Sequence, residues 1–256
     1  MSLVRNRYID LLKKCVLDNI YKNQKDFYRK TNATEDEIVN GIYYPDRAHT
    51  MIGEERLNNI QNLMEYCINN NIPGDFIETG VWRGGATIFM AGILQAYSIK
   101  DRKVFVADSF EGLPLSVSSY PIDVKINSKC HTIEYLKVSQ QEVEDNFKAY
   151  DLLDDNVVFI KGYFEHSLVN APIDQLALLR LDGDMYSSTI QVFNILYDKV
   201  SIGGYIIIDD WTLPGAKAAT LDFRKSRNIH DPIIEIPLLG KSKVKQNQCC
   251  YWKKST

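Results

Sequence analysis

The 256-residue sequence contains no apolar run that approaches the roughly 20 residues a membrane-spanning helix needs. Its net charge is −3, so it lacks the basic surplus typical of proteins that bind nucleic acid or anionic membranes. Charged residues are threaded through residues 1–15 and no small-residue cleavage site is present, so a signal peptide is not expected. These absences predict a soluble, cytoplasmic protein whose partner is a small molecule.

Cysteine patterns typical of metal sites are also missing. The five cysteines, an odd number, form no CxxC pair and no Cys/His spacing of the zinc type. They are expected to be reduced thiols, with Cys67, Cys249 and Cys250 as packing residues. Repeats, low-complexity tracts and clear linkers are absent, and a hydrophobic content of 45% fits one large α/β domain.

Two apolar runs, each followed by paired acids, dominate the segment 176–211. Residues 176–181 precede Asp182-Gly183-Asp184, and residues 205–208 precede Asp209-Asp210. Short apolar runs bounded by turn residues are typical of strands buried on both faces, and the stretch between them is long enough for a crossover helix. Because ligands of open parallel sheets lie beyond the carboxyl ends of the strands, the four carboxylates are expected at one edge of one sheet. This arrangement suggests a metal site.

Each acidic pair also has an ordinary structural explanation. Asp182-Gly183-Asp184 is a composition common in Asx turns. Asp209 and Asp210 are harder to explain in this way, because adjacent carboxylates after a buried run repel one another unless a cation lies between them.

A second motif begins with the predicted strand 75–78. It continues with a turn that contains Gly80, Gly84 and Gly85 and with an apolar helix, which together form the nucleotide-binding unit of α/β folds. The spacing is not the GxGxxG of dinucleotide enzymes. Glu78 at the strand end is unfavourable for a pyrophosphate and suits a cationic amino group, as in S-adenosylmethionine; a tight turn without a ligand is the alternative.

The next predicted strand, residues 103–107, ends at Asp108. A carboxylate at this position is well placed to accept hydrogen bonds from ribose hydroxyls. The alternative is a turn residue that only terminates the strand. Its pairing with the glycine-rich turn favours the first interpretation.

The remaining segments set the domain organisation. Residues 4–20 have the periodicity of an amphipathic helix, which packs either on the domain or on a second subunit, so that a homodimer is one option. Residues 21–48 read as a polar arm, which divides the chain into an N-terminal helix and arm, 1–48, and a main domain, 49–256. Residues 109–137 are long and irregular, as in functional lids. Ser139 is expected to cap a helix at 140–150.

The loop after the third predicted strand, 156–161, and the tail each have a recognisable feature. Aromatic residues Tyr163 and Phe164 in this loop are candidates to flank an adenine ring, whereas the lone His166 is more readily explained as a surface residue. The tail predicts two strands around a turn at 240–243.

Several stretches together resemble the macrocin O-methyltransferase (TylF-type) family. They are YYPDRAHTMIGEERLNNI, FIETGVWRGGATIFMAG, ADSFEGLP, residues 136–168, LRLDGDMYSST and GGYIIIDDWTLPGAKAATLDFR. The resemblance implies a Rossmann-like class I methyltransferase fold, with a mostly parallel seven-stranded sheet, an antiparallel last strand and helices on both faces. It also implies S-adenosylmethionine and Mg²⁺ as cofactors and a sugar hydroxyl as the methyl acceptor.

The same resemblance assigns roles to individual residues. Asp182, Asp209 and Asp210 fall on metal-ligand positions, and Asp184 or Asp182 is the general base. The cofactor-binding set comprises Met51, Glu78, Gly80, Asp108, Ser109, Tyr163 and Phe164. Family members often have Asp where this chain has His166, which bears on the adenine edge and not on the chemistry.

Three other functions compete with sugar methylation. A metal-dependent methyltransferase of catechols or phenols would use the same carboxylates, because vicinal phenols also chelate a hard cation, and Trp82, Tyr186 and Trp211 would suit either pocket. A non-catalytic cofactor-binding protein and a nicotinamide oxidoreductase fit less well. The sequence does not decide whether the acceptor sugar belongs to a glycosylated natural product, a nucleotide sugar or a surface polysaccharide.

Overall fold

The computed structural model describes residues 3–21, 23–117, 119–126, 129–239 and 248–255. Its centre is a seven-stranded sheet in the order β3-β2-β1-β4-β5-β7-β6, in which β1 to β5 are parallel and β7 runs antiparallel to β5 and β6. The predicted sheet and its antiparallel last strand are confirmed. The strands are β1 (Asp75–Thr79), β2 (Val104–Asp108), β3 (Val157–Lys161), β4 (Leu176–Leu181), β5 (Val200–Ile208), β6 (Ile234–Glu235) and β7 (Cys250–Lys253).

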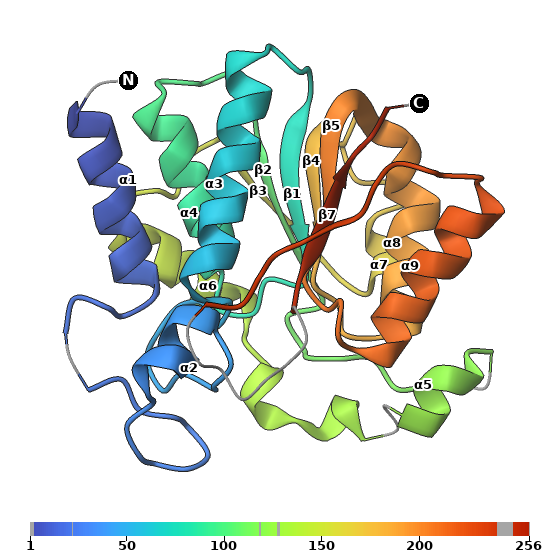
Figure 1. Ribbon diagram of the computed structural model, residues 1–256, viewed down its shortest axis with the longest axis horizontal. Helices are drawn as coiled ribbons and strands as arrows, with labels where there is room; N and C mark the ends of the chain where they lie inside the picture. The colour runs from blue at the N-terminus through green and yellow to red at the C-terminus, as the bar shows by residue number, and fades with distance from the viewer. Residues whose placement is uncertain (1–2, 22, 118, 127–128, 240–247, 256) are drawn as a thin grey trace.

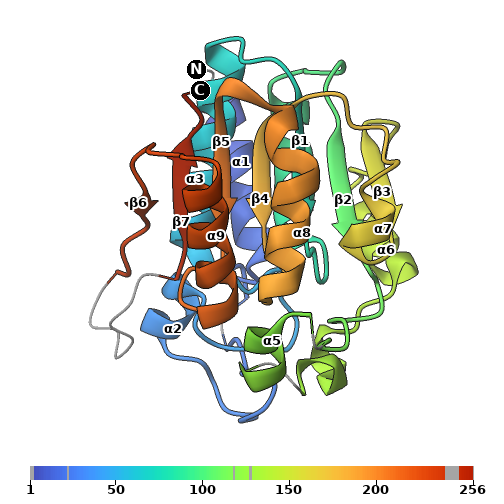
Figure 2. The ribbon, with the colours of Figure 1, turned by 90° about the vertical axis from the view of Figure 1, so that its right-hand side faces the viewer.

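Helices cover both faces of the sheet (Figures 1 and 2). One face carries α1 (Leu3–Val16), α3 (Gly53–Asn69), α4 (Gly85–Ala96) and α6 (Gln140–Ala149). The other carries α7 (Phe164–Ser167), α8 (Tyr186–Leu196) and α9 (Pro214–Ser226). In the described part of the chain no helix is long and apolar enough to cross a membrane.

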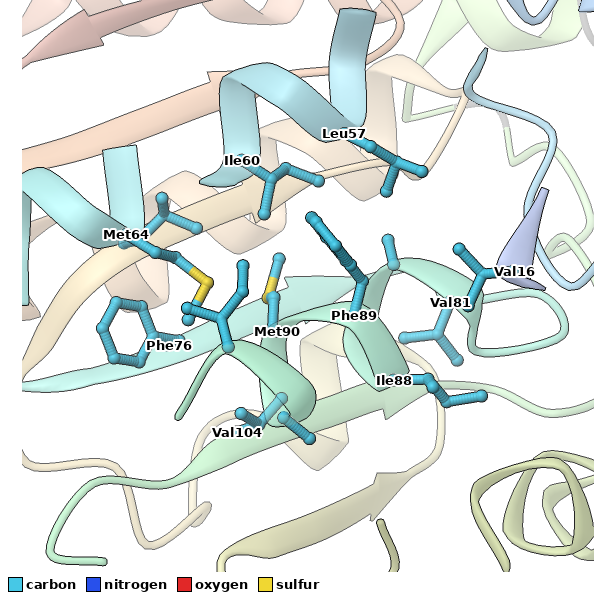
Figure 3. Packing of buried hydrophobic residues seen from close by; sticks show 14 of the residues in the cluster. Val16, Leu57, Ile60, Met64, Phe76, Val81, Ile88, Phe89, Met90 and Val104 are labelled. Carbon is cyan, nitrogen blue, oxygen red and sulfur yellow. The ribbon is translucent and has the colours of Figure 1, made fainter. Parts of the chain in front are cut away.

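Strand periodicity divides the core between these two faces. Phe76 packs under α3 and α4, while its neighbour Ile77 belongs to the cluster under α8 and α9. Figure 3 shows the first cluster, in which side chains of α3, α4 and β1 face one another. Its labelled members are Val16, Leu57, Ile60, Met64, Phe76, Val81, Ile88, Phe89, Met90 and Val104. Each such side chain contributes about 1.5–3 kcal/mol when fully buried, so the sheet is a rigid support for groups at its edge.

The N-terminal segments differ in part from their predictions. The first helix ends at Val16 and packs on α4 through Ile9 and Leu12. The arm is not wholly irregular, because it contains α2 (Glu35–Asn40). Thr34 and Glu37 form the capping box that begins α2, a signal present in the sequence.

The segment 109–137 also contains more regular structure than expected. It includes the helix α5 (Pro121–Ile126) and the 3₁₀ turns η1 (Cys130–Thr132) and η2 (Glu134–Leu136). Both α2 and α5 lie beyond the carboxyl ends of the parallel strands, at the lower end of both ribbon views (Figures 1 and 2). The arm and the segment 109–137 therefore enclose the end of the sheet where a ligand of this fold class would bind.

The tail strands, the cysteines and the cap of α6 agree with their predictions where the structure describes them. The tail strands β6 and β7 are present, and the predicted turn at 240–243 lies outside the described residues. All five cysteines are free thiols, and Cys67, Cys249 and Cys250 are buried, as expected of packing residues. The Ser139 Oγ accepts a hydrogen bond from the Glu142 N–H and caps α6 as predicted.

Candidate functional site: an acidic cavity at the sheet edge

A cavity of about 580 Å³ lies at the carboxyl ends of the strands, where β1 is flanked by β2 and β4. Chain connections diverge at this point of the sheet, the usual ligand position in open α/β folds. The cavity is bordered by every residue that the sequence assigned to the cofactor, the metal or the general base. These are Met51, Glu78, Gly80, Asp108, Ser109, Tyr163, Phe164, Asp182, Asp184, Asp209 and Asp210.

The glycine-rich turn after β1 is held by two close contacts. Gly80 has φ +93°, and a Cβ at this position would lie 1.7 Å from the Asp182 carbonyl oxygen. Glycine is therefore required here by the neighbouring loop as well as by its backbone conformation. The Asp108 carboxylate accepts hydrogen bonds from the N–H groups of Val81 and Phe110, both at 2.8 Å. Asp108 thus ties the glycine turn to its own turn, and the residue also borders the cavity.

Glu78 forms a buried ion pair that the sequence analysis did not identify. Glu78 on β1 lies directly opposite Arg180 on β4, and the Arg180 Nη1 donates to the Glu78 Oε1. The other carboxylate oxygen, Oε2, is buried without a hydrogen-bond partner in the described residues. Burial raises the pKa of Glu78 to about 8, against the opposing effect of Arg180. Glu78 borders the cavity, and a carboxylate oxygen left without a partner suits the cationic amino group of a ligand.

Arg180 also contacts two of the predicted metal ligands. Its Nη1 donates to the Asp182 Oδ2 at 2.9 Å, and its Nη2 lies 2.5 Å from the Asp209 Oδ1 without hydrogen-bond alignment. Although burial alone would lower the pKa of Arg180, the surrounding carboxylates raise it well above its ordinary value. Arg180 is therefore a fixed positive charge shared by Glu78, Asp182 and Asp209.

A second arginine reaches the same cluster from the start of α3. The Arg56 Nη1 donates to the Asp209 Oδ2, and its other nitrogens donate to the carbonyl oxygens of Ile52, Gly41 and Met51. Arg56 thus connects the acidic edge to the turn that holds Met51 at the cavity.

The sequence contains a signal for the ion pairs of Arg180 that was missed. Arg180 is a charged residue inside the buried run LALLRL, and an Arg in such a place is almost always paired.

The last two acids approach one another through the backbone. The Asp184 N–H donates to the Asp210 Oδ2 at 2.8 Å, and Asp184 adopts φ 60°, which is uncommon for a residue other than glycine. Burial, followed by the charges of Asp182 and Asp209, raises the pKa of Asp184 to about 7. Burial and the neighbouring carboxylates raise the pKa of Asp210 well above its ordinary range. The cluster therefore contains more carboxyl groups than its two arginines can pair, and the surplus is held by raised pKa values in protonated form.

Three of these carboxylates meet the geometric requirement for a shared cation. One oxygen from each of Asp182, Asp209 and Asp210 lies within 4.8 Å of the others. Carboxylate oxygens are the donors that Mg²⁺ prefers, and raised carboxyl pKa values are what a nearby cation would reverse. The donor set therefore fits a divalent cation, although Arg56 and Arg180 already face the two oxygens of Asp209.

Aromatic and hydroxyl groups line the other end of the cavity. Tyr163 and Phe164 begin α7 and border the cavity, whereas His166 points away with its side chain 81% exposed. The Ser109 Oγ donates to the Gly112 carbonyl oxygen at 2.6 Å and accepts from the Glu111 N–H at 3.1 Å, so it stabilises its own turn.

The three aromatic residues proposed for the pocket separate into two groups. Trp82 lines the cavity, while its indole N–H donates to the Tyr135 carbonyl oxygen. Trp211 is buried and donates to Glu235, and the Tyr186 hydroxyl donates to Asp222. Neither Trp211 nor Tyr186 is among the residues that border the cavity, so both serve in packing and surface contacts.

The fold and the site together define the class of the protein. A mostly parallel seven-stranded sheet with an antiparallel strand beside β5, and carboxylates at the ends of β1 and β2 around a cofactor-sized cavity, is the arrangement of class I methyltransferases. The chain matches the family Macrocin-O-methyltransferase (TylF) over residues 5–254 and belongs to it. It is an S-adenosylmethionine-dependent O-methyltransferase, as the sequence predicted.

Individual relatives are similar over almost the whole chain. The chain is 45% identical over 235 residues to the demethyldecarbamoylnovobiocin O-methyltransferase of Streptomyces niveus, covering 90% of this chain and 89% of that protein. It is 40% identical over 239 residues to the 8-demethyl-8-(2,3-dimethoxy-alpha-L-rhamnosyl)-tetracenomycin-C 4'-O-methyltransferase of Streptomyces olivaceus, covering 92% and 91%. The solved structure of the O-methyltransferase NovP has a TM-score of 0.89 at 42% identity, covering 98% of this chain and 100% of that one.

Proposed function

We propose that this protein transfers the methyl group of S-adenosylmethionine to a sugar hydroxyl of a glycosylated natural product and that it requires Mg²⁺. The observation that carries the proposal is the convergence of Asp182, Asp184, Asp209 and Asp210 on the cavity that also contains Glu78 and Asp108. A relative named for an acceptor that contains a rhamnosyl sugar supports the acceptor class.

The cofactor occupies the β1–β2 side of the cavity in this proposal. The free Oε2 of Glu78 binds the ammonium group of the methionine part, and Gly80 leaves room for its backbone. Asp108 accepts hydrogen bonds from the ribose hydroxyls. Ser109, Tyr163 and Phe164 border the adenine, and Met51 covers the cofactor from the turn before α3.

The acceptor meets the carboxylates of the β4–β5 side. Asp182, Asp209 and Asp210 would hold the Mg²⁺, which when bound lowers the pKa of a sugar hydroxyl and orients it. Asp184 takes the proton, with Asp182 as the alternative base. Asp184 suits this role by position, because it borders the cavity beside the proposed metal ligands and its N–H donates to the Asp210 carboxylate.

The part of the acceptor beyond the sugar contacts the arm and the segment 109–137, for which we propose the role of a lid. The residues that these segments contribute to the cavity are largely apolar or aromatic: Tyr44, Leu115, Val117, Tyr120, Ile133 and Leu136. Apolar lining with few polar groups is typical of small-molecule sites. A homodimer through the exposed face of α1 remains a prediction.

Calorimetry on metal-stripped protein tests the proposal. S-adenosylmethionine should bind without metal, and para-nitrophenyl α-L-rhamnoside should bind only after Mg²⁺ is added. Catechol serves as the competing acceptor, and product is measured by mass spectrometry. Turnover of catechol but of no glycoside in a panel would contradict the acceptor class, and undiminished glycoside turnover in chelator would contradict the metal.

A further inference from the structure

The lid helix α5 has no fully buried apolar side chain among its six residues. Val124 and Ile126 are 44% and 45% exposed, and Asp123 is the one residue of α5 that is buried, with 0% of it accessible. An isolated buried carboxylate is strongly unfavourable, so its partners must account for the position of the helix.

Those partners are backbone groups at the beginning of α8. The Asp123 Oδ1 accepts from the Tyr186 N–H and its Oδ2 accepts from the Ser187 N–H, both at 2.8 Å. The first N–H groups of a helix have no partner inside the helix, and Met185 at the cap position makes no side-chain hydrogen bond. The first turn of α8 also contains no acidic residue of its own. Asp123 therefore supplies the missing N-terminal cap of α8 from more than sixty residues away in the chain.

The capped turn directly follows the acidic loop of the site. Asp184 lies two residues before the start of α8, and Ser187 and Ser188 border the cavity. On the lid side, Tyr120 borders the same cavity and its ring lies 5.9 Å from that of Tyr186. Asp123 does not border the cavity itself, so it acts through the elements that it joins.

We propose that Asp123 is a positioning residue that latches the lid to the helix after the catalytic loop and thereby forms the acceptor side of the site. This inference rests on the proposed function for the identity of the acceptor, but the latch itself does not. The carboxylate binds the positive end of the α8 dipole, an interaction that can form and break as the lid closes and opens. Because the contact is polar and α5 contributes little apolar burial, loss of this one carboxylate releases the lid without dismantling the core.

Hydrogen exchange followed by mass spectrometry tests the latch without any acceptor. In Asp123→Ala with S-adenosylhomocysteine bound, the amides of the first turn of α8 and of α5 should exchange about tenfold faster than in the wild type. Trypsin should also cleave faster after Lys125, which is exposed on α5. Asp123→Asn retains one acceptor oxygen, so its exchange and cleavage rates should lie between those of the wild type and of Asp123→Ala.

Ser139→Ala is the matched control, because it removes the side-chain cap of α6, a helix that begins after the segment 109–137 and does not include α5 or α8. It lowers helix stability by a similar mechanism, yet exchange at α5 and α8 should match the wild type. The affinity for S-adenosylmethionine should change less than about threefold in both variants. With para-nitrophenyl α-L-rhamnoside, the acceptor KM should rise about tenfold, equivalent to about 1.4 kcal/mol, in Asp123→Ala alone, with a smaller change in kcat.

Wild-type exchange and cleavage in both Asp123 variants would overturn the latch, as would equal effects in Ser139→Ala. Faster exchange together with an unchanged acceptor KM would restrict Asp123 to lid stability and overturn its positioning role. If no glycoside is methylated by the wild type, the proposed acceptor fails, while exchange still decides the latch. If Asp123→Ala does not fold, Asp123→Asn carries the same comparison.

Discussion

The cavity has a floor, formed by the carboxyl ends of β1, β4 and β5 with the acids Glu78, Asp182, Asp184, Asp209 and Asp210, and a lid, formed by the arm and the segment 109–137. The floor and the lid hold their buried carboxylates in different ways. In the floor, Glu78, Asp182 and Asp209 lie at strand ends and share the guanidinium of Arg180, which strand pairing places directly opposite Glu78. In the lid, Asp123 has backbone N–H groups of another element as partners. The floor is therefore formed by the register of the sheet and the lid by one cross-chain cap. Reactivity should depend on the first and access of the acceptor on the second.

The largest effect is expected from a floor carboxylate that meets no arginine. Asp210→Asn keeps the size of the side chain but removes charge from the proposed metal site, so turnover should fall about 10³-fold or more. Calorimetry should show S-adenosylmethionine binding near the wild-type affinity. The surface variant Asp145→Asn is the control for a change of net charge. Turnover within about tenfold of the wild type would remove Asp210 from the metal site.

Among the charged residues of the floor, Arg180 should make the largest contribution to the free energy of unfolding. Arg180→Met leaves Glu78 buried without its counter-charge and Asp209 with Arg56 alone, so the free energy of unfolding should fall by about 3–5 kcal/mol. Urea denaturation measures this change. Adding Glu78→Gln to Arg180→Met should recover part of the loss, because one unpaired charge is then removed. Strict additivity of the two substitutions would show that the pair does not act as a unit.

Two glycines with positive φ allow the floor and the lid to be compared directly. A Cβ on Gly80 would meet the Asp182 carbonyl oxygen at 1.7 Å, whereas a Cβ on Gly112 (φ +88°) would meet the flexible Lys137 side chain at 2.7 Å. Gly80→Ala should therefore destabilise by about 3 kcal/mol or more and Gly112→Ala by about 1 kcal/mol. Denaturation of both variants tests this order. Equal losses would contradict the steric difference between the two regions.

A smaller effect is expected from pH, and it should arise in the floor. The folded protein raises the pKa of Asp182 to about 6 and that of Asp184 to about 7, so it retains protons that the unfolded chain has lost. The associated stability is present below about pH 4 and is lost as pH rises through these values. In chelator, Tm should fall by a few degrees from about pH 5 to about pH 8. Mg²⁺ should reverse this fall, and Asp184→Asn should reduce it; a flat profile would contradict the raised pKa values.

The floor could be predicted from the sequence because its determinants are local. Apolar runs that end in acids identify parallel strands, and the geometry of a parallel sheet then brings Glu78, Asp182 and Asp209 to one edge. The pairing of Arg180 with Glu78 depends on strand register, which the separate runs do not specify. The capping box of Thr34 and Glu37 is a local sequence signal for α2.

The lid could not be predicted in the same way. Its helix α5 is only six residues long, with little periodicity, and its stabilising contact joins Asp123 to a helix in a distant part of the chain. An aspartate in an irregular segment has many ordinary explanations, and the N-terminus of α8 shows only that its own cap is missing. Such a contact becomes visible when the two elements are placed in three dimensions.

Because Gly80 has no room for a side chain, its turn limits which substitutions this enzyme can accept. The turn that contains Gly80 and the loop that bears Asp182 occupy adjoining volumes, so a side chain added to one displaces the other. Substitutions in the Gly80 turn or the Asp182 loop would therefore disturb the proposed sites of the methyl donor and the methyl acceptor together. New acceptor ranges should therefore arise, in evolution or in the laboratory, by diversification of residues 113–117 and 129–136 and of the arm, while the Gly80 and Asp182 backbones stay constant. A library confined to those segments would explore acceptor choice on an unchanged reaction centre.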